Sequence, residues 1–160
     1  MGKYITESSK IVGCLAPVSI GSSAAVGKPI DFKLYDRVTF YVYVGSIGGS
    51  TGLVTVQKGT TSSLGTAIGY NYQFSSTGTA AFSVLDSATV TTAATATGLA
   101  IGTSPVQYGI LAIELKASDL GAGYNWAGVF IAGSGTVVCC IWAECYAARQ
   151  MAAVPADPTS

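Results

Sequence analysis

The stretch from Thr136 to Ala148, with the sequence TVVCCIWAECYAA, restricts the possible fold more than any other part of this chain. Successive side chains of a strand point to opposite faces. One face would carry Val137, Cys139, Ile141, Ala143 and Cys145, and the other Val138, Cys140, Trp142, Glu144 and Tyr146. Both faces are mainly apolar, and β-branched and aromatic residues favour a strand over a helix. We therefore expect a strand that is covered on both sides.

Two β-hairpins are predicted from apolar runs joined by glycine-rich turns. The run Trp126 to Ala132 precedes Gly133-Ser134-Gly135 and then the 136–148 stretch, which is typical of a hairpin that closes a domain. The run Arg37 to Val44 is followed by the loop 45–52 and by a returning segment, 53–58. This loop lacks the Gly-Lys-Ser/Thr ending of a phosphate-binding loop and precedes a strand, so a hairpin loop is favoured.

Further strands are predicted at 30–35, 67–74, 80–85 and 108–115, and 11–20 is typical of an edge strand because it contains Gly13 and Pro17. Residues 116–121 are expected to form a turn. The fold class that follows is all-β, a single-domain β-sandwich or jelly roll of about eight to ten short antiparallel strands. Residues 1–10 are expected to form an N-terminal arm, 11–149 the β-sandwich domain, and 150–160 an extended, proline-containing tail.

The charge content argues against nucleic acid and membrane surfaces as partners. Only 10% of the residues are charged and the formal net charge is zero, so long-range attraction to phosphates is missing. Because the net charge is zero, charge repulsion between copies does not oppose their association. This suits a chain inside an assembly and predicts a homo-oligomer. The first residues lack the basic and apolar regions of a signal peptide, so synthesis in a cytoplasm is expected.

Residues for catalysis are scarce. The chain has no histidine, the commonest general base. Glu114 and Glu144 are the acids placed inside predicted strands, and an acid-pair hydrolase would need them to face one cleft. Salt bridges to Lys116 or Arg149 are the more typical role of such acids. We expect no enzyme activity, no cofactor and no metal site.

Two aspartates, Asp31 and Asp119, are expected to cap backbone groups in turns. The four cysteines, Cys14, Cys139, Cys140 and Cys145, are expected to be buried thiols. Cys139 and Cys145 lie about 20 Å apart along a strand, too far to share one metal ion. Pairing of Cys14 with another cysteine remains open.

Aromatic residues offer the main candidate contact surface. The face that carries Tyr41 and Tyr43 fits a second buried layer or a contact surface, and the former is favoured. Trp126, Trp142 and the tyrosines are also able to stack on sugars. This leaves a carbohydrate-binding or adhesin-like β-sandwich module, on a phage or cell surface, as the alternative function.

The C-terminal third resembles small structural proteins of tailed-bacteriophage heads. The resemblance lies in GILAIELKASDL (residues 109–120), in YNW (124–126) and in VVCCIWAECYAAR (137–149), which a proline-containing tail follows. It implies a β-sandwich or jelly-roll decoration (cement) protein of the virion that binds the assembled major capsid protein, usually as a trimer. Partner contacts are then expected from both arms and from exposed aromatic residues, with Tyr4, Ile5, Tyr41, Tyr43, Trp126, Arg149, Pro155 and Pro158 as candidates.

Overall fold

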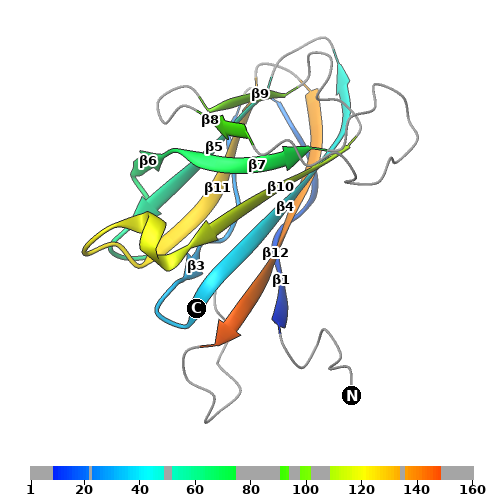
Figure 1. The fold of residues 1–160 in the computed structure, drawn as a ribbon. Helices are drawn as coiled ribbons and strands as arrows, with labels where there is room; N and C mark the ends of the chain where they lie inside the picture. The colour runs from blue at the N-terminus through cyan, green and yellow to red at the C-terminus, as the bar shows by residue number, and fades with distance from the viewer. Residues whose placement is uncertain are drawn as a thin grey trace, which may run out of the picture.

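Two β-sheets pack face to face in the computed structural model of the protein (Figure 1). The structure describes residues 9–21, 23–48, 52–74, 91–93, 98–101, 109–133 and 136–148, without the side chains of 46–48, 91–93 and 147–148. Every strand pairing within these ranges is antiparallel. The predicted all-β sandwich is therefore confirmed.

The strands divide evenly between the two sheets. Sheet A has the order β1 (Ser9–Ile20), β12 (Thr136–Ala148), β4 (Tyr35–Gly48), β10 (Gly109–Lys116), β7 (Tyr70–Phe74) and β8 (Thr91–Ala93). Sheet B has the order β2 (Ala25–Val26), β11 (Trp126–Gly133), β5 (Gly52–Gly59) and β6 (Thr66–Ile68), with β3 (Ile30–Asp31) also paired to β11 and β9 (Leu99–Ile101) to β5. One short 3-10 helix, η1 (Ala117–Leu120), follows β10.

The core lies between the sheets and is built by alternating residues. On β4, the inward side chains Val38, Phe40, Val42 and Val44 have no exposed surface. They belong to one hydrophobic cluster with the inward residues of β5 and β11 from sheet B. Full burial of such a side chain stabilises the fold by about 1.5–3 kcal/mol, so this layer is the main source of stability.

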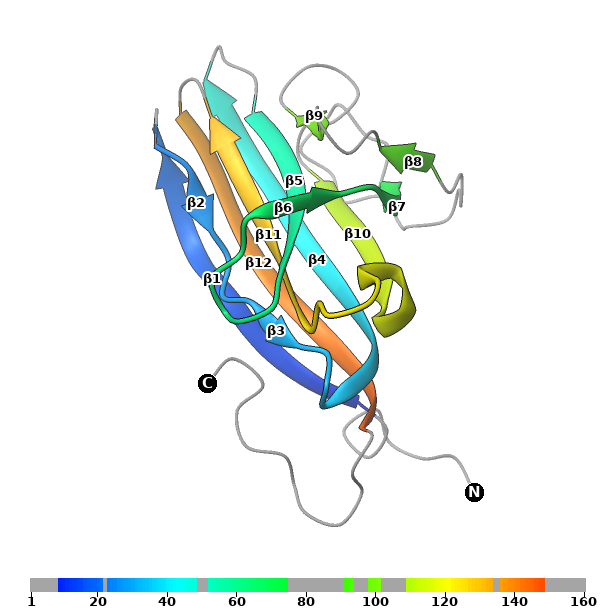
Figure 2. The ribbon, with the colours of Figure 1, turned by 90° about the vertical axis from the view of Figure 1, so that its left-hand side faces the viewer.

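The 136–148 stretch forms β12, which lies between β1 and β4 within sheet A (Figure 2). The predicted face that runs from Val137 to Cys145 points into the core, where its five residues are at most 1% exposed. The opposite face is only half-buried, so the prediction of a strand covered on both sides is wrong for this face. This face forms part of the outer surface of sheet A.

Both predicted hairpins are wrong. β11 and β12 belong to different sheets, and so do β4 and β5. β12 instead pairs with β4 and β1, while β11 pairs with β5. Each connection crosses from one sheet to the other. Inward side chains such as Val42 and Val54 therefore pack in the same core, although their strands are not hydrogen-bonded to each other. Alternating apolar residues around a glycine-rich turn suit both arrangements, which is why the sequence pattern did not separate them.

Two predicted strands are shorter than expected. The segment 67–74 contains two strands, since β6 belongs to sheet B and β7 to sheet A, with Gly69 between them. In 30–35, β3 covers only Ile30–Asp31 and β4 begins at Tyr35, although Ile30 is buried and Lys33 exposed as the alternation predicts. The chain turns there because Asp31 Oδ1 accepts a hydrogen bond from the backbone N–H of Lys33 at 2.9 Å.

Other local predictions are confirmed. β1 is an edge strand of sheet A, and β10 covers the segment predicted at 108–115. β1 begins at Ser9, inside the predicted arm. The turn expected at 116–121 is η1, in which Asp119 Oδ2 accepts a hydrogen bond from the backbone N–H of Lys116 at 2.8 Å. The segment 80–85 lies outside the described residues.

Helices contribute almost nothing to this architecture. In the part of the chain that the structure describes, no helix is both long and apolar enough to cross a membrane. The candidate sites are consequently faces and edges of sheets.

Candidate functional site

The cross-strand register sets the side chains on the outer face of sheet A in rows, and two neighbouring rows cross the middle of this face. In the first row, Trp142 on β12 lies opposite Tyr41 on β4, which lies opposite Ala112 on β10 and then Gln73 on β7. The second row runs from Glu144 through Thr39 and Glu114 to Asn71 in the same strand order. Residues that are far apart in the sequence thus form one continuous surface.

An aromatic pair marks the middle of this face. The rings of Tyr41 and Trp142 are stacked, with centroids 5.5 Å apart and planes at 16°. Such stacking adds about 0.5–1.5 kcal/mol beyond the area that the rings bury. Both side chains are half-buried, so the pair is a rigid element of the surface rather than a part of the core.

Glu144 is held by hydroxyl groups from three directions. Ser9 Oγ donates to Glu144 Oε1 at 2.7 Å, and the Tyr41 hydroxyl donates to Oε2 at 3.4 Å. Partial burial raises the pKa of Glu144, but hydrogen bonds from Tyr146, Ser9 and Tyr41, together with the charge of Arg37, outweigh it, so this pKa lies below its ordinary value. The carboxylate is therefore charged and structural at neutral pH.

The two tyrosines that contact Glu144 are correspondingly hard to ionise. The pKa of Tyr146 is raised by burial and by its hydrogen bonds with Glu144 and Tyr41. The pKa of Tyr41 is raised mainly by burial, and the negative charge of Glu144 adds to this. Both hydroxyls remain hydrogen-bond donors over the physiological range.

Arg37 connects this network to the second acid of the face. Its Nη1 lies 4.0 Å from Glu114 Oε2, and its guanidinium carbon lies 4.7 Å from the centre of the Tyr146 ring. About half of each side chain in the ion pair is exposed, at 47% and 48%. An exposed pair of this kind adds little stability, so Glu114 is available to a ligand.

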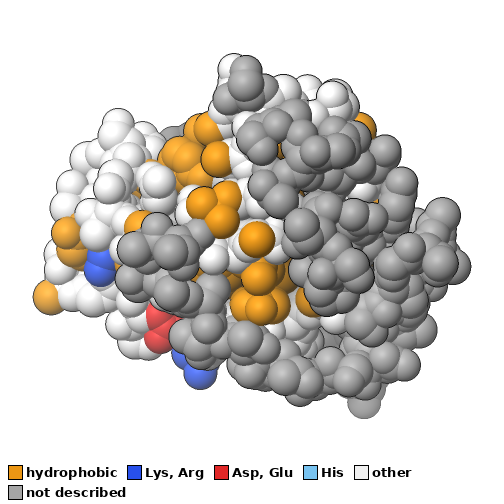
Figure 3. All heavy atoms as spheres, turned by 90° about the horizontal axis from the view of Figure 1, so that it is seen from above, with side chains coloured by type: hydrophobic (Ala, Val, Ile, Leu, Met, Phe, Trp, Pro, Cys, Tyr) orange, Lys and Arg blue, Asp and Glu red, His pale blue; other side chains and the backbone are white. Residues whose placement is uncertain are grey.

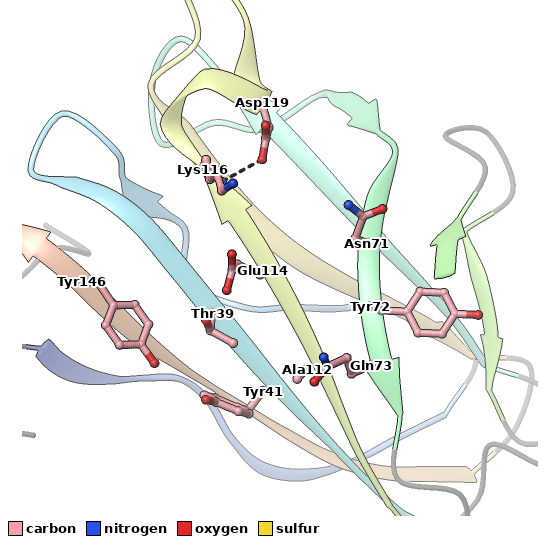
Figure 4. Close-up of a pocket in the computed structure, with 10 residues that line it drawn as sticks. All are labelled: Thr39, Tyr41, Asn71, Tyr72, Gln73, Ala112, Glu114, Lys116, Asp119 and Tyr146. Atoms are coloured by element: carbon pink, nitrogen blue, oxygen red, sulfur yellow. Dashed lines mark hydrogen bonds between the residues drawn. The ribbon is translucent and has the colours of Figure 1, made fainter. Parts of the chain in front are cut away.

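A pocket of about 490 Å³ opens on this face, and we call it the face pocket. It exists because Thr39 and Ala112 are short and lie between longer side chains on every side. Figure 4 shows tyrosines approaching from the β12 and β4 side and amide side chains from the β7 side. The lining consists of Thr39, Tyr41, Asn71, Tyr72, Gln73, Ala112, Glu114, Lys116, Asp119 and Tyr146.

A second cavity, the edge hollow, lies at the β1 side of the sheet. It has a volume of about 470 Å³ and a largely apolar lining: Gly13, Cys14, Leu15, Ala16, Pro17, Lys28, Cys140, Ile141 and Trp142. Trp142 lines the edge hollow while Tyr41 lines the face pocket. The stacked aromatic pair is therefore the wall between the two cavities.

The structure brings together only some of the predicted contact residues. Tyr41 and Tyr43 share the outer face of β4 and are half-buried, so the favoured interpretation as a fully buried layer is wrong. Trp126 begins β11 in sheet B and does not join them. The remaining candidates lie outside the described residues: Tyr4, Ile5, Arg149, Pro155 and Pro158.

Trp142 and Tyr146 were predicted only as aromatic residues able to stack on sugars, and Gln73 was not among the predicted candidates. The alternation within 136–148 already places Trp142 and Tyr146 on one face with Glu144. What the sequence lacked was the register that sets this face beside Tyr41 and then beside Gln73. Such register depends on strands distant in the chain.

Glu114 and Glu144 meet only part of the requirement for an acid-pair hydrolase, which is that both face one cleft. Glu114 and Glu144 do face the same side of sheet A, flanking Thr39, but Glu114 alone lines the face pocket. The pKa of Glu144 is lowered, whereas a glycosidase acid needs a raised one. Among the described residues, no three His, Cys, Asp or Glu side chains are grouped so as to hold a metal ion.

The four cysteines all lie within the described ranges and none of them forms a disulfide, which answers the question left open for Cys14. Cys14, Cys139 and Cys145 are buried as expected, and Cys140 is half-buried on the outer face of β12. Burial raises the pKa of Cys139 to about 11 and that of Cys145 to about 12. Neither thiol is a nucleophile at neutral pH.

Comparison with known proteins gives no relative: no protein-family description, no curated protein and no solved structure matches this chain. The resemblance to phage head proteins stays a prediction.

Proposed function

We propose that this protein is a non-enzymatic structural protein of a virion, a capsid decoration protein that binds and stabilises the assembled major capsid shell. In this proposal it acts as a homo-oligomer, with a trimer favoured, on the capsid surface. Its partners are other copies of itself and the major capsid protein, without nucleic acid or membrane.

The observation that carries the proposal is the position of the exposed apolar side chains. The large hydrophobic residues exposed in the described part of the chain are Ile11 at 63%, Val18 at 38% and Val26 at 50%. All of them belong to β1 and β2, which end sheets A and B. We call this surface the β1/β2 edge.

β1 and β2 lie next to each other at the β1/β2 edge. The backbone N–H of Lys28 donates to the carbonyl of Cys14 at 2.9 Å, so the segment after β2 is bonded directly to β1. The apolar edge hollow opens at the same place. Figure 2 shows β1, β2 and β3 along one side of the sandwich.

An edge of this kind favours association with a second copy of the chain. A long edge strand presents unpaired backbone groups, and apolar side chains beside it gain from being covered. Copies with zero net charge do not repel one another over long distances. In the view from above (Figure 3), hydrophobic side chains gather near the middle of the surface that is drawn in colour, and the few charged ones there lie away from them.

The test begins with the mass in solution, measured by light scattering on a sizing column over a wide concentration range. We expect a closed oligomer, and we expect the double variant Ile11→Lys with Val26→Lys to be a monomer. Ala122→Lys, at an exposed position next to η1, is the matched control and should keep the native mass. A wild-type monomer at every concentration would remove the self-association on which the proposal depends.

The second step is co-sedimentation with assembled heads that lack this protein. Binding by the wild-type chain is expected, together with its loss on deletion of residues 1–8 or 150–160. Both terminal segments lie outside the described residues, and the deletions leave β1 intact because it begins at Ser9. Normal binding by both truncated forms would rule out the arms, and no binding by the full chain would rule out the capsid role.

A further inference from the structure

We infer that the face pocket binds a neutral saccharide, held between the ring of Tyr41 and the polar side chains of β7 and β10. This site is distinct from the β1/β2 edge and does not depend on the assembly role. It gives the carbohydrate-binding alternative a specific place on the molecule.

The Tyr41 ring is oriented so that one of its faces can receive a ligand. One face of the ring is stacked on Trp142, which lies opposite on β12. The neighbour on the other side is Ala112 on β10, whose methyl group leaves space above the sheet. A pyranose ring presents a flat apolar C–H face, and an aromatic ring fixed by a second one is a ready platform for it.

The polar groups around this platform suit the hydroxyl groups of a sugar. Gln73 lies opposite Ala112, and Asn71 lies opposite Glu114, so two amides and a carboxylate border the same hollow. Amides both donate and accept hydrogen bonds, while a carboxylate accepts two or more. Neighbouring sugar hydroxyls, each a donor and an acceptor, fit this set.

The balance of charged side chains at the face pocket bears on the charge of its ligand. The lining carries one cation, Lys116, and two anions, Glu114 and Asp119. Arg37, which is not a lining residue, pairs with Glu114, so the charges at the pocket nearly balance. A phosphate site would need several cations or a helix N-terminus aimed at the ligand. The pocket therefore favours an uncharged ligand rich in hydroxyl groups.

The volume of the face pocket is large enough for one or two sugar units. A volume of about 490 Å³ lies within the range of small-ligand sites, about 300–1,000 Å³. Figure 4 shows Tyr41 and Tyr146 on one side of the pocket and Asn71 and Gln73 on the other, with Glu114 between them. A disaccharide spanning these groups would contact the platform and both amides together.

The experiment uses the full chain and a panel of neutral trisaccharides: maltotriose, cellotriose, xylotriose, mannotriose and chitotriose. Binding is followed by saturation-transfer NMR and by titration calorimetry. At least one trisaccharide should bind, and Gln73→Ala should weaken that binding about fivefold, as expected for one lost hydrogen bond. Gln57→Ala, the same change on a half-buried strand residue of sheet B, is the control and should bind like the wild type.

A second variant makes the result independent of any single hydrogen bond. Ala112→Leu fills the floor of the pocket without removing a polar group, so it should abolish binding. A thermal unfolding midpoint close to that of the wild type would confirm that the variant is folded. The inference is overturned if no trisaccharide binds, if the pocket variants bind as tightly as Gln57→Ala, or if inorganic phosphate competes for the site. None of these outcomes alters the expected mass or head binding, so the two proposals fail separately.

Discussion

The hydroxyl of Ser9 donates a hydrogen bond of 2.7 Å to the carboxylate of Glu144, which is 135 positions away in the sequence. This contact attaches the first described residue of β1 to β12. Tyr41 from β4 contacts the other oxygen of the same carboxylate. One charged group thus holds three neighbouring strands of sheet A together on their outer side.

Replacement of Glu144 by Gln should make the protein less stable, and the loss should depend on pH. The pKa of Glu144 in the folded state lies below its ordinary value of 4.5, because hydroxyl donors and Arg37 favour the charged form. Its contribution is therefore complete above that ordinary value and disappears as the pH falls through the lowered pKa. Urea unfolding from about pH 7 down to about pH 2 measures the difference between wild type and variant.

Glu114→Gln is the matched control on the same face. Its ion pair with Arg37 is half exposed, so the change should cost no more than about 1 kcal/mol at neutral pH. A difference between Glu144→Gln and wild type that stays constant with pH would show that the hydroxyl cluster does not lower the pKa of Glu144.

Cysteine reactivity in the native protein should follow burial. Cys139 and Cys145 have raised pKa values of about 11 and about 12 because burial disfavours the thiolate. Cys140 is half-buried and should be alkylated first by iodoacetamide, with mass spectrometry locating the label. The other three thiols should react only at the rate of unfolding, and Cys140→Ser should remove the early step. Early labelling of Cys139 would contradict the packing of β12.

Phe40 tests the core between the sheets. It has no exposed surface and lies on the inward face of β4, next to β12 and β10. Phe40→Ala should cost about 3–5 kcal/mol in the free energy of unfolding, because the cavity adds to the lost burial. Lys33→Ala, at an exposed turn position, should change it by less than about 0.5 kcal/mol. Chemical denaturation of both variants gives the comparison.

Local patterns in the sequence predicted the strands well. The alternation from Val137 to Tyr146 separated the two faces of β12 correctly, although both were expected to be covered and one is only half-buried, and Asp31 and Asp119 cap turns as expected. These features depend on neighbouring residues, so they are visible without the fold. The same alternation placed Trp142 beside Glu144 on one face.

Long-range pairing was not predictable in this way. A connection through Gly133 predicts a reversal of the chain, but whether the next strand pairs in the same sheet depends on strands elsewhere. β12 pairs with β1 on one side and β4 on the other, so its backbone hydrogen-bonding groups on both edges have partners without β11. The face pocket depends on this register, because Ala112 is a floor only when Tyr41 and Gln73 lie on either side of it.

Two glycines provide a matched test of backbone constraints. Gly98 precedes β9 with φ at 61°, a conformation that favours glycine, and an added Cβ would collide with the Val54 carbonyl and lie 2.6 Å from Thr55 Cγ2. Gly98→Ala should therefore cost more than about 1 kcal/mol in the free energy of unfolding. A Cβ added to Gly13 in β1 would meet no atom within 4 Å, so Gly13→Ala should be neutral or stabilising. Thermal and urea unfolding measure the stabilities of the two variants. Equal stabilities would show that the approach of Gly98 to β5 does not constrain the fold.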